Sequence, residues 1–134
     1  MSTRNMLRAK LHRLTLTGAN PDYEGSIAID RDLLDAAEIL QFEQVHVWNV
    51  SNGNRLQTYA IDAPRGSGEV ALNGAAALKG APGDIIIVAT FSQMDETEAR
   101  AHVPVVVHVD ARNRRRSKPR AVGGAIETPN ALID

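Results

Sequence analysis

The sequence contains no cysteine, few aromatic residues and no long apolar run. Without cysteine, the 134-residue chain can form neither a disulfide nor a thiolate nucleophile, and nothing points to an oxidising compartment, so we expect a cytoplasmic protein. Aromatic residues make up only 4% of the chain, so the core must be built from Val, Ile, Leu and Ala. No stretch approaches the roughly 20 apolar residues that span a bilayer, and the charged N-terminus lacks the apolar segment of a secretion signal. Membrane insertion and secretion are therefore disfavoured.

What the sequence does contain is a series of short segments rich in β-branched residues and bounded by Gly, Pro, Asn or Asp. These segments are Leu11–Thr17, Val45–Val50, Arg55–Ile61, Glu69–Leu72, Ile85–Phe91 and Val103–Val109. Residues 85–89 form a continuous apolar run, which is typical of a strand buried on both faces. Six short strands in a chain of this length predict an all-β domain, mainly β with short helices, folded as a small barrel around one core.

Turn and helix signals separate the predicted strands. Asn52-Gly53 tolerates the positive φ angles of a type I′ turn and predicts a hairpin between the second and third segments. Apolar residues at helical spacing over residues 33–40 predict a short helix capped by Asp30 or Asp32. A second short helix is expected from Asp95.

Positive charge is concentrated near the C-terminal end of a chain whose net charge is −1. The cluster consists of Arg112, Arg114, Arg115, Arg116, Lys118 and Arg120. Hydrophobic periodicity also stops after Asp110, so we expect a β domain over residues 1–110 and a basic, disordered tail over 111–134. The tail raises the alternative of a small β-barrel that binds nucleic acid. The scarcity of aromatic residues and the lack of a net positive charge in residues 1–110 make nucleic acid an unlikely partner.

Tyr23-Glu24-Gly25-Ser26 carries the strongest hint of chemistry. A Gly-Ser bond held in a tight turn can be the place where a protein cuts its own backbone, because glycine lacks the Cβ that would hinder attack by the serine hydroxyl. The dipeptide alone is typical of an ordinary turn, and a second copy, Gly66-Ser67, lies between Arg65 and Gly68. The Gly25-Ser26 dipeptide therefore predicts a cleavage site only if other motifs of the chain support it.

Five separate motifs supply that support, in a fixed order and at fixed mutual distances. They are Met6-Leu7 with Lys10-Leu11-His12-Arg13; Tyr23-Glu24-Gly25-Ser26-Ile27-Ala28-Ile29-Asp30; Trp48-Asn49-Val50-Ser51-Asn52-Gly53; Arg55 with Thr58-Tyr59; and Leu72-Asn73-Gly74-Ala75-Ala76-Ala77. Together they resemble the pyruvoyl-dependent aspartate 1-decarboxylase family from about residue 4 to about residue 109. The resemblance implies a six-stranded double-psi β-barrel, a homotetramer with active sites between subunits, and conversion of L-aspartate to β-alanine and CO₂ for pantothenate and coenzyme A synthesis.

The resemblance also implies a cofactor made from the chain itself. Ser26 attacks the carbonyl of Gly25, the backbone is cut between them, and Ser26 becomes a covalently bound pyruvoyl group. Thr58 is the residue that the resemblance assigns to self-processing, and a maturation helper protein is a further expected partner. The new ketone forms a Schiff base with the substrate amine and accepts the electrons released on decarboxylation. We expect Gly66-Ser67 to stay intact.

The substrate roles that the resemblance implies fall on three residues. Arg55 grips the carboxylate that remains, Lys10 assists it, and Tyr59 returns a proton to the former α-carbon. Position alone leaves other readings open, because an arginine after a hairpin turn is commonly solvated and a strand tyrosine commonly packs.

Asn73 and the small residues Gly74, Ala75 and Ala76 are expected to offer an amide and backbone donors to the substrate. Asn73 could equally cap a short helix. His12 and Tyr23 lie in matching motifs near the substrate or cleavage site, although His12 could be a structural histidine.

Two further readings concern metals and lost catalysis. The four histidines have no ligand spacing, so no metal site is expected, and Trp48 is expected in the core or at a subunit interface. A regulatory subunit that has lost catalysis is a third reading. It is opposed by the intact set Lys10, Gly25, Ser26, Arg55, Thr58, Tyr59 and Asn73.

Overall fold

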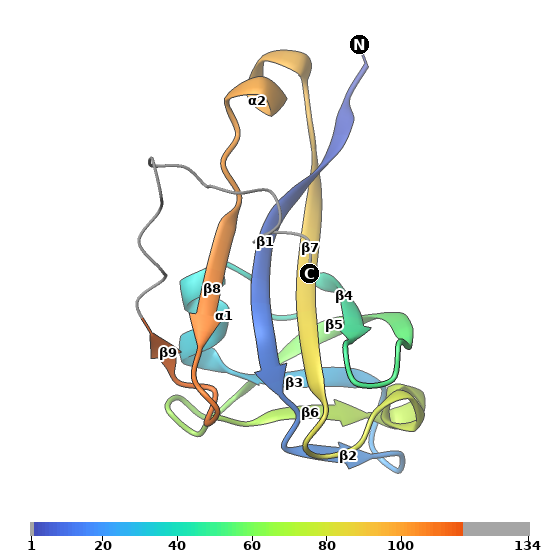
Figure 1. Cartoon of the computed structure of the whole chain (residues 1–134). Helices are drawn as coiled ribbons and strands as arrows, with labels where there is room; N and C mark the ends of the chain where they lie inside the picture. Colours follow the sequence, from blue (N-terminus) through green and yellow to red (C-terminus); the bar gives the residue numbers. More distant parts are fainter. Residues whose placement is uncertain (1, 117–134) are drawn as a thin grey trace.

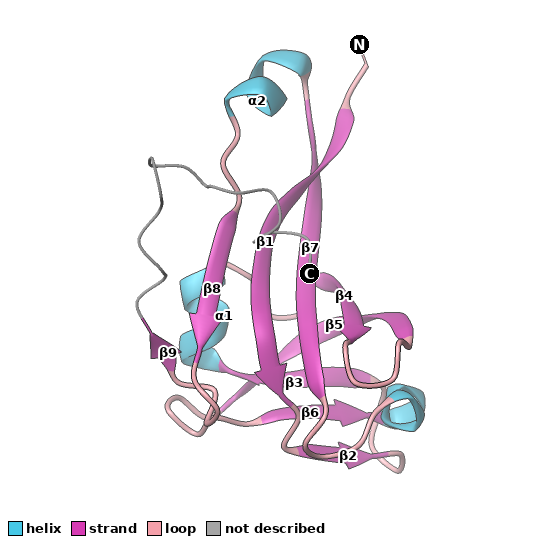
Figure 2. Ribbon diagram, in the orientation of Figure 1, coloured by secondary structure: helices cyan, strands magenta, loops and turns pink. Residues whose placement is uncertain are grey.

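The structure, a computed structural model, describes residues 2–116, which form a mainly β fold (Figures 1 and 2). In chain order the elements are β1 (Arg4–Thr15), β2 (Gly18–Asn20), β3 (Ser26–Asp30), α1 (Arg31–Ala37), β4 (Gln44–Asn49), β5 (Arg55–Ala63), β6 (Val70–Asn73), the 3₁₀ helix η1 (Gly74–Lys79), β7 (Ile85–Met94), α2 (Glu96–Ala101), β8 (Val105–Val109) and β9 (Arg115–Arg116). The predicted mainly β class is confirmed, and each of the six predicted strands is present.

The strands pair in the order β2-β6-β3-β5-β4-β7-β1-β8-β9. β1 lies between β7, which is antiparallel to it, and β8, which is parallel. β3 has the same kind of environment, antiparallel to β6 and parallel to β5. Figure 1 shows β1, β7 and β8 side by side, with β3, β6 and β2 running across one end of them. Within residues 2–116 the recorded pairs do not join β2 to β9, so the pairing order is open.

The core is aliphatic, as the scarcity of aromatic residues requires. All five residues of β3 are buried, and Ile86, Val88 and Ala89 of β7 have no exposed surface. The prediction that residues 85–89 form a strand buried on both faces is therefore confirmed. Leu33 and Leu34 of α1 close the core from outside the sheet.

Both predicted helices are present and begin at the expected caps. The Asp30 carboxylate accepts a hydrogen bond from the Asp32 N–H, and Asp95 accepts one from the Glu98 N–H at 2.8 Å. α1 ends at Ala37, because Glu38 adopts a left-handed conformation, and Leu40 is left exposed. No helix within residues 2–116 is long and apolar enough to cross a membrane.

The hairpin between β4 and β5 is confirmed, but its turn is not of type I′. The Asn49 N–H donates to the Asn54 carbonyl at 2.8 Å, which closes a longer loop than a two-residue turn. Gly53 has φ 81°, whereas Asn52 does not adopt a positive φ. Type I′ requires positive φ at both central residues, so only the glycine matches the prediction.

Three short strands, β2, β3 and β9, were not predicted. β3 begins at Ser26, so the Gly25-Ser26 bond joins a bend to a strand and does not lie within a turn. β9 lies in the segment expected to be disordered, and it pairs with His108 and Val109. The part of the predicted tail from 117 to 134 lies outside the described residues.

Ordered contacts continue past residue 110, where the sequence pattern places the domain boundary, because Asn113 is buried and has φ 61°. Its side-chain Oδ1 accepts from the Thr15 N–H, and its Nδ2 donates to the carbonyls of Thr15 and Gly68, each at 2.8 Å. These bonds fasten the turn before β9 to the end of β1 and to the loop before β6. Residues 111–116 are therefore part of the fold.

We expect Asn113→Ala to lower the free energy of unfolding by about 2–4 kcal/mol, because it removes three hydrogen bonds and leaves buried backbone groups unsatisfied. Urea unfolding of both proteins at equal concentration would measure the loss. Arg115→Ala, at an exposed position of β9, is the control and should change the free energy by less than about 0.5 kcal/mol. Equal stability of Asn113→Ala and the parent chain would contradict the assignment of this turn to the fold.

Candidate active site

Ser26, the first residue of β3, is buried and its hydroxyl is oriented by two partners. The Asn73 Nδ2 donates to the Ser26 Oγ at 3.2 Å, and the Oγ donates to the Glu24 carbonyl at 3.4 Å. Ser26 and Asn73 lie opposite each other in the antiparallel pair of β3 and β6. Asn73 occupies the N-cap position of η1, as the cap reading expects, but it makes no side-chain capping bond there, and its amide donates to Ser26 instead.

The backbone before Ser26 is held by a close approach of Gly74. Gly74 has φ 66°, and a Cβ placed on it would lie 2.6 Å from the Cα and N of Gly25 and 2.8 Å from the Tyr23 carbonyl oxygen. A Cβ on Gly25 would meet nothing nearer than the Asn73 carbonyl at 4.0 Å. The absence of a side chain is therefore required at Gly74 more than at Gly25, where the sequence argument had put it.

The second Gly-Ser pair has a different environment. The N–H groups of Gly66 and Gly68 donate to the two carboxylate oxygens of Asp30, the residue that caps α1. The Ser67 Oγ is exposed and accepts a hydrogen bond from the Glu69 N–H at 3.1 Å. This loop is a structural anchor for Asp30, and its serine is neither buried nor bound to a side-chain amide.

Tyr59 lies on β5, the strand next to β3. In the parallel pair of β3 and β5, Ile27 lies opposite Ala60, so Tyr59, one residue before Ala60, lies beside Ser26. Thr58, the residue before Tyr59, is paired with Val45 of β4. The Tyr59 ring contacts Phe42, with 6.3 Å between the ring centroids. Both Thr58 and Tyr59 are half-buried.

The loop that carries Phe42 is fixed by Glu43. The Glu43 carboxylate accepts hydrogen bonds from Arg8 at 2.6 Å and from Thr90 at 2.7 Å. Burial by itself raises the pKa of Glu43, but the hydrogen bonds from Thr90, from the Leu40 N–H and from Arg8 outweigh it and hold the pKa below its ordinary value. A charged Glu43 thus joins this loop to β1 and β7.

A second group of predicted residues lies on β1. Lys10 is fully buried and is paired with Ala89 of β7 and Val106 of β8, and His12 is paired with His108. Paired residues share a face of a sheet, so Lys10, His12, Val106 and His108 lie on one face. The His12 and His108 rings make an edge-to-face contact at 5.5 Å.

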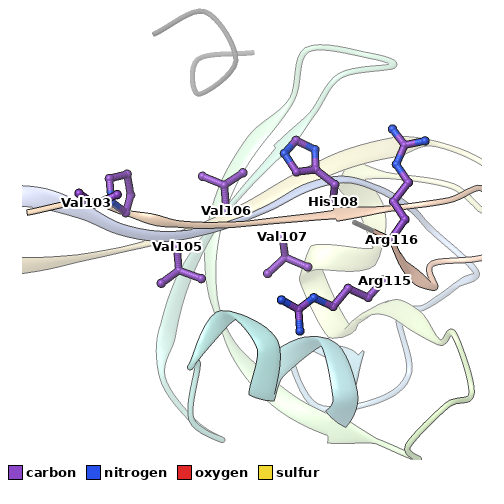
Figure 3. Close-up of a pocket in the computed structure, with 8 residues that line it drawn as sticks. Val103, Val105, Val106, Val107, His108, Arg115 and Arg116 are labelled. Carbon is purple, nitrogen blue, oxygen red and sulfur yellow. The ribbon is translucent and has the colours of Figure 1, made fainter. Parts of the chain in front are cut away.

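A cavity of about 590 Å³ borders this face along β8. It is lined by Val103, Pro104, Val105, Val106, Val107, His108, Arg115 and Arg116. Figure 3 shows Val106, His108 and Arg116 pointing to one side of β8, with Val105 and Val107 pointing to the other, toward α1. In the sequence His108 is one of four scattered histidines; the alternation of side chains along β8, together with the parallel pairing of β8 with β1, is the signal that links it to Lys10.

Arg55, at the start of β5, is exposed but ordered. Its guanidinium carbon lies 5.1 Å from the centre of the Trp48 ring, and Trp48 in turn contacts Phe91. Trp48 is half-buried. Trp48 is thus not a fully buried core residue, and its ring holds the Arg55 guanidinium through a cation–π contact.

The predicted site residues therefore form two groups. The serine group contains Tyr23, Gly25, Ser26, Asn73 and Gly74, and the cationic group contains Lys10 and His12 of β1; Arg55 belongs to neither, because it lies on β5. Ala75 and Ala76 follow Gly74 in η1, exposed and half-buried respectively. The strand order puts β5, β4 and β7 between β3 of the serine group and β1 of the cationic group. Among residues 2–116 no cluster of three His, Asp or Glu side chains could hold a metal ion.

These observations define a small, mainly β protein whose candidate site is built around a buried, amide-bound serine. Comparison with known proteins makes this class specific. The sequence model of the aspartate decarboxylase family matches residues 1–116, and the chain belongs to this family.

Relatives in bacteria are similar over most of the chain. The aspartate 1-decarboxylase of Chromobacterium violaceum is 54% identical over 111 residues, which cover 83% of this chain and 88% of the relative. Aspartate 1-decarboxylase 2 of a Polaromonas species is 50% identical over 112 residues, covering 84% and 89%. Among solved structures, the rationally designed protein mkDPBB_sym_86 gives a TM-score of 0.44 at 17% identity and covers 57% of this chain and 90% of its own.

We expect Gly74→Ala to destabilise the fold by about 3 kcal/mol or more, because its methyl group would overlap the Gly25 backbone and φ 66° disfavours alanine. Gly25→Ala should cost less than about 1 kcal/mol. Both are made in a Ser26→Ala background, which excludes backbone cleavage at that serine, and compared by thermal and urea unfolding. The reverse order of stabilities would show that the steric constraint lies at Gly25.

Proposed function

We propose that this protein cuts its own backbone between Gly25 and Ser26 and then converts L-aspartate to β-alanine and CO₂, a step that feeds pantothenate and coenzyme A synthesis. The observation that carries the proposal is the environment of Ser26: a buried hydroxyl that accepts a hydrogen bond from Asn73 and follows a glycine packed against Gly74. The names of the bacterial relatives supply the substrate.

The cleavage is an acyl shift followed by an elimination. The Ser26 Oγ bonds to the Gly25 carbonyl carbon, the Gly25 to Ser26 C–N bond breaks, and the hydroxyl proton moves to the released amine. The Cβ–Oγ bond then breaks as the Cα proton is removed, which frees the Gly25 carboxylate and leaves a dehydroalanine. Water replaces its nitrogen, which leaves as ammonia, and a pyruvoyl group remains. Thr58 is proposed to support the first step.

The residues around Ser26 fit a pyruvoyl group, because the Asn73 amide that donates to the Ser26 Oγ can donate equally to a carbonyl oxygen. When present, this group supplies a carbonyl that bonds to the substrate amine and takes up the electron pair left by CO₂. Backbone donors near Ala75 and Ala76, with Tyr23 at the edge, complete the proposed pocket.

Lys10 of the cationic group and Arg55 of β5 are proposed to bind the substrate carboxylate that is retained. The departing carboxylate loses its charge in the transition state, so holding it as an anion would slow the reaction, and Arg55 and Lys10 belong on the other one. His12 is proposed to line the same face. Tyr59, on the strand next to Ser26, is proposed to return the proton to the former α-carbon.

We further propose a homotetramer in which the cationic group of one copy faces the serine group of another. The support is the division of the site: three strands separate β3 from β1 within one chain. A substrate held by both groups would then lie between subunits. A maturation helper and a cytoplasmic location remain predictions from the sequence.

The nucleic-acid alternative loses support from both the family and the basic segment. Arg114 donates to the Gly66 carbonyl at 3.0 Å, and the N–H groups of Arg112 and Arg114 donate to the Asp110 carboxylate. These hydrogen bonds lower the pKa of Asp110, with Arg114 contributing most. Part of the predicted basic tail is thus used to build a turn.

Mass spectrometry of the purified full-length chain should show two fragments divided after Gly25, and this protein should release β-alanine from L-aspartate. Ser26→Ala should remain one chain and be inactive, because the hydroxyl that starts the cleavage is missing. Ser67→Ala is the matched control and should cleave and turn over like the parent. A single intact chain that nevertheless makes β-alanine would refute the proposed cofactor.

We expect Tyr59→Phe to cut itself normally but to turn over L-aspartate about 100-fold or more slowly, because the phenol proton is lost while the ring and its contact with Phe42 are kept. The fraction cleaved is read by mass spectrometry and kcat by β-alanine formation. Unchanged kcat in fully cleaved Tyr59→Phe would remove Tyr59 from the mechanism.

A further inference from the structure

Three asparagine side chains of the β4–β5 hairpin meet at one carbonyl group. The Nδ2 atoms of Asn49, Asn52 and Asn54 donate to the Lys79 carbonyl oxygen at 3.2, 3.1 and 3.2 Å. Lys79 is the last residue of η1, whose first residue is Gly74. A carbonyl oxygen has two lone pairs, so three donors around it leave little freedom in its position. We name Asn49, Asn52 and Asn54 the asparagine clamp.

The clamp also organises the hairpin itself. Asn49 is buried, and its Oδ1 accepts from the N–H groups of Ser51 and Asn52 while its Nδ2 also donates to Asp84 at 2.9 Å. The Asn52 Oδ1 accepts from the Asn54 N–H at 2.8 Å. Each asparagine therefore bonds both within the hairpin and to η1, so hairpin and helix end form one rigid unit.

Arg55 follows the clamp directly. The Asn54 carbonyl accepts from the Asn49 N–H, which fixes the backbone one residue before Arg55. At the side-chain end, the Arg55 guanidinium lies over the Trp48 ring. An exposed arginine ordinarily samples many rotamers, and ordering it on ligand binding weakens affinity. Here contacts within the chain itself hold both ends of Arg55.

We propose that Asn52 and Asn54 are positioning residues that hold Arg55 in the orientation that grips the substrate carboxylate. This inference rests on the proposed function, because it takes the role of Arg55 from there. Neither asparagine needs to touch the substrate. Their effect should appear in substrate affinity, since the carboxylate held by Arg55 is bound alike before and during decarboxylation.

The test is the steady-state kinetics of full-length, cleaved Asn52→Ala and Asn54→Ala with L-aspartate. Each change removes an amide from a partly or fully exposed position, so both proteins should fold. We expect KM to rise about three- to ten-fold, with kcat within about two-fold and cleavage complete. A fall in kcat or in the cleaved fraction with unchanged KM would overturn the proposal. Gln93→Ala, which removes an exposed amide on β7, is the control and should leave both constants unchanged.

Repeating the Asn52→Ala and Asn54→Ala changes in an Arg55→Ala background separates an effect that acts through Arg55 from a general loss of rigidity in the hairpin. If they act through Arg55, they should raise KM no further once the guanidinium is gone. An equal rise in both backgrounds overturns the proposal. If Arg55→Ala alone leaves KM unchanged, the role of Arg55 in the proposed function fails and the clamp fails with it. If Arg55→Ala raises KM but the asparagine variants do not, only the clamp is refuted.

Discussion

The contact between Gly74 and Gly25 is the constraint on which the candidate site depends. Gly74, the first residue of η1, lies so close to the backbone before Ser26 that a Cβ atom on it would be 2.6 Å from the Cα and N atoms of Gly25. Only a residue without a side chain fits at this position. This approach places Asn73 opposite Ser26 and lets its amide reach the serine hydroxyl. Because β3 is buried between β5 and β6, a displaced Gly25 would also disturb the strand that carries Tyr59.

Rigid connections then carry this local geometry to the rest of the site. The asparagine clamp joins the far end of η1 to the hairpin before Arg55, and Glu43 joins the loop beside Tyr59 to β1 and β7. These connections are hydrogen bonds, which hold their geometry more strictly than apolar contacts do. These connections fix the relative positions of groups that lie on separate strands. Because β5, β4 and β7 separate β1 from β3 within one chain, we propose that the site is shared by two copies.

Local patterns predicted what local interactions control. Six of the nine strands, both α-helix caps and the buried run of β7 follow from β-branched residues, short acidic residues and apolar continuity. β3 was missed because its five residues run directly from the Gly-Ser signal into the cap at Asp30, with no turn residue between. Asn113 was missed because an isolated asparagine in a basic segment gives no sign that it is buried.

The sequence by itself determined the family and the mainly β class and supplied the candidate site residues, because motif order and spacing are properties of the chain alone. Only the tertiary structure decided how those residues are used. It showed that Ser26 is buried and bound by an amide, whereas Ser67 is exposed. It also showed that the steric requirement for a glycine is stricter at Gly74 than at Gly25, and that the Asn73 amide donates to a serine and not to the helix that follows it. The physical reason is distance along the chain: Ser26 and Asn73 are 47 residues apart, and their contact exists only once β3 and β6 have paired.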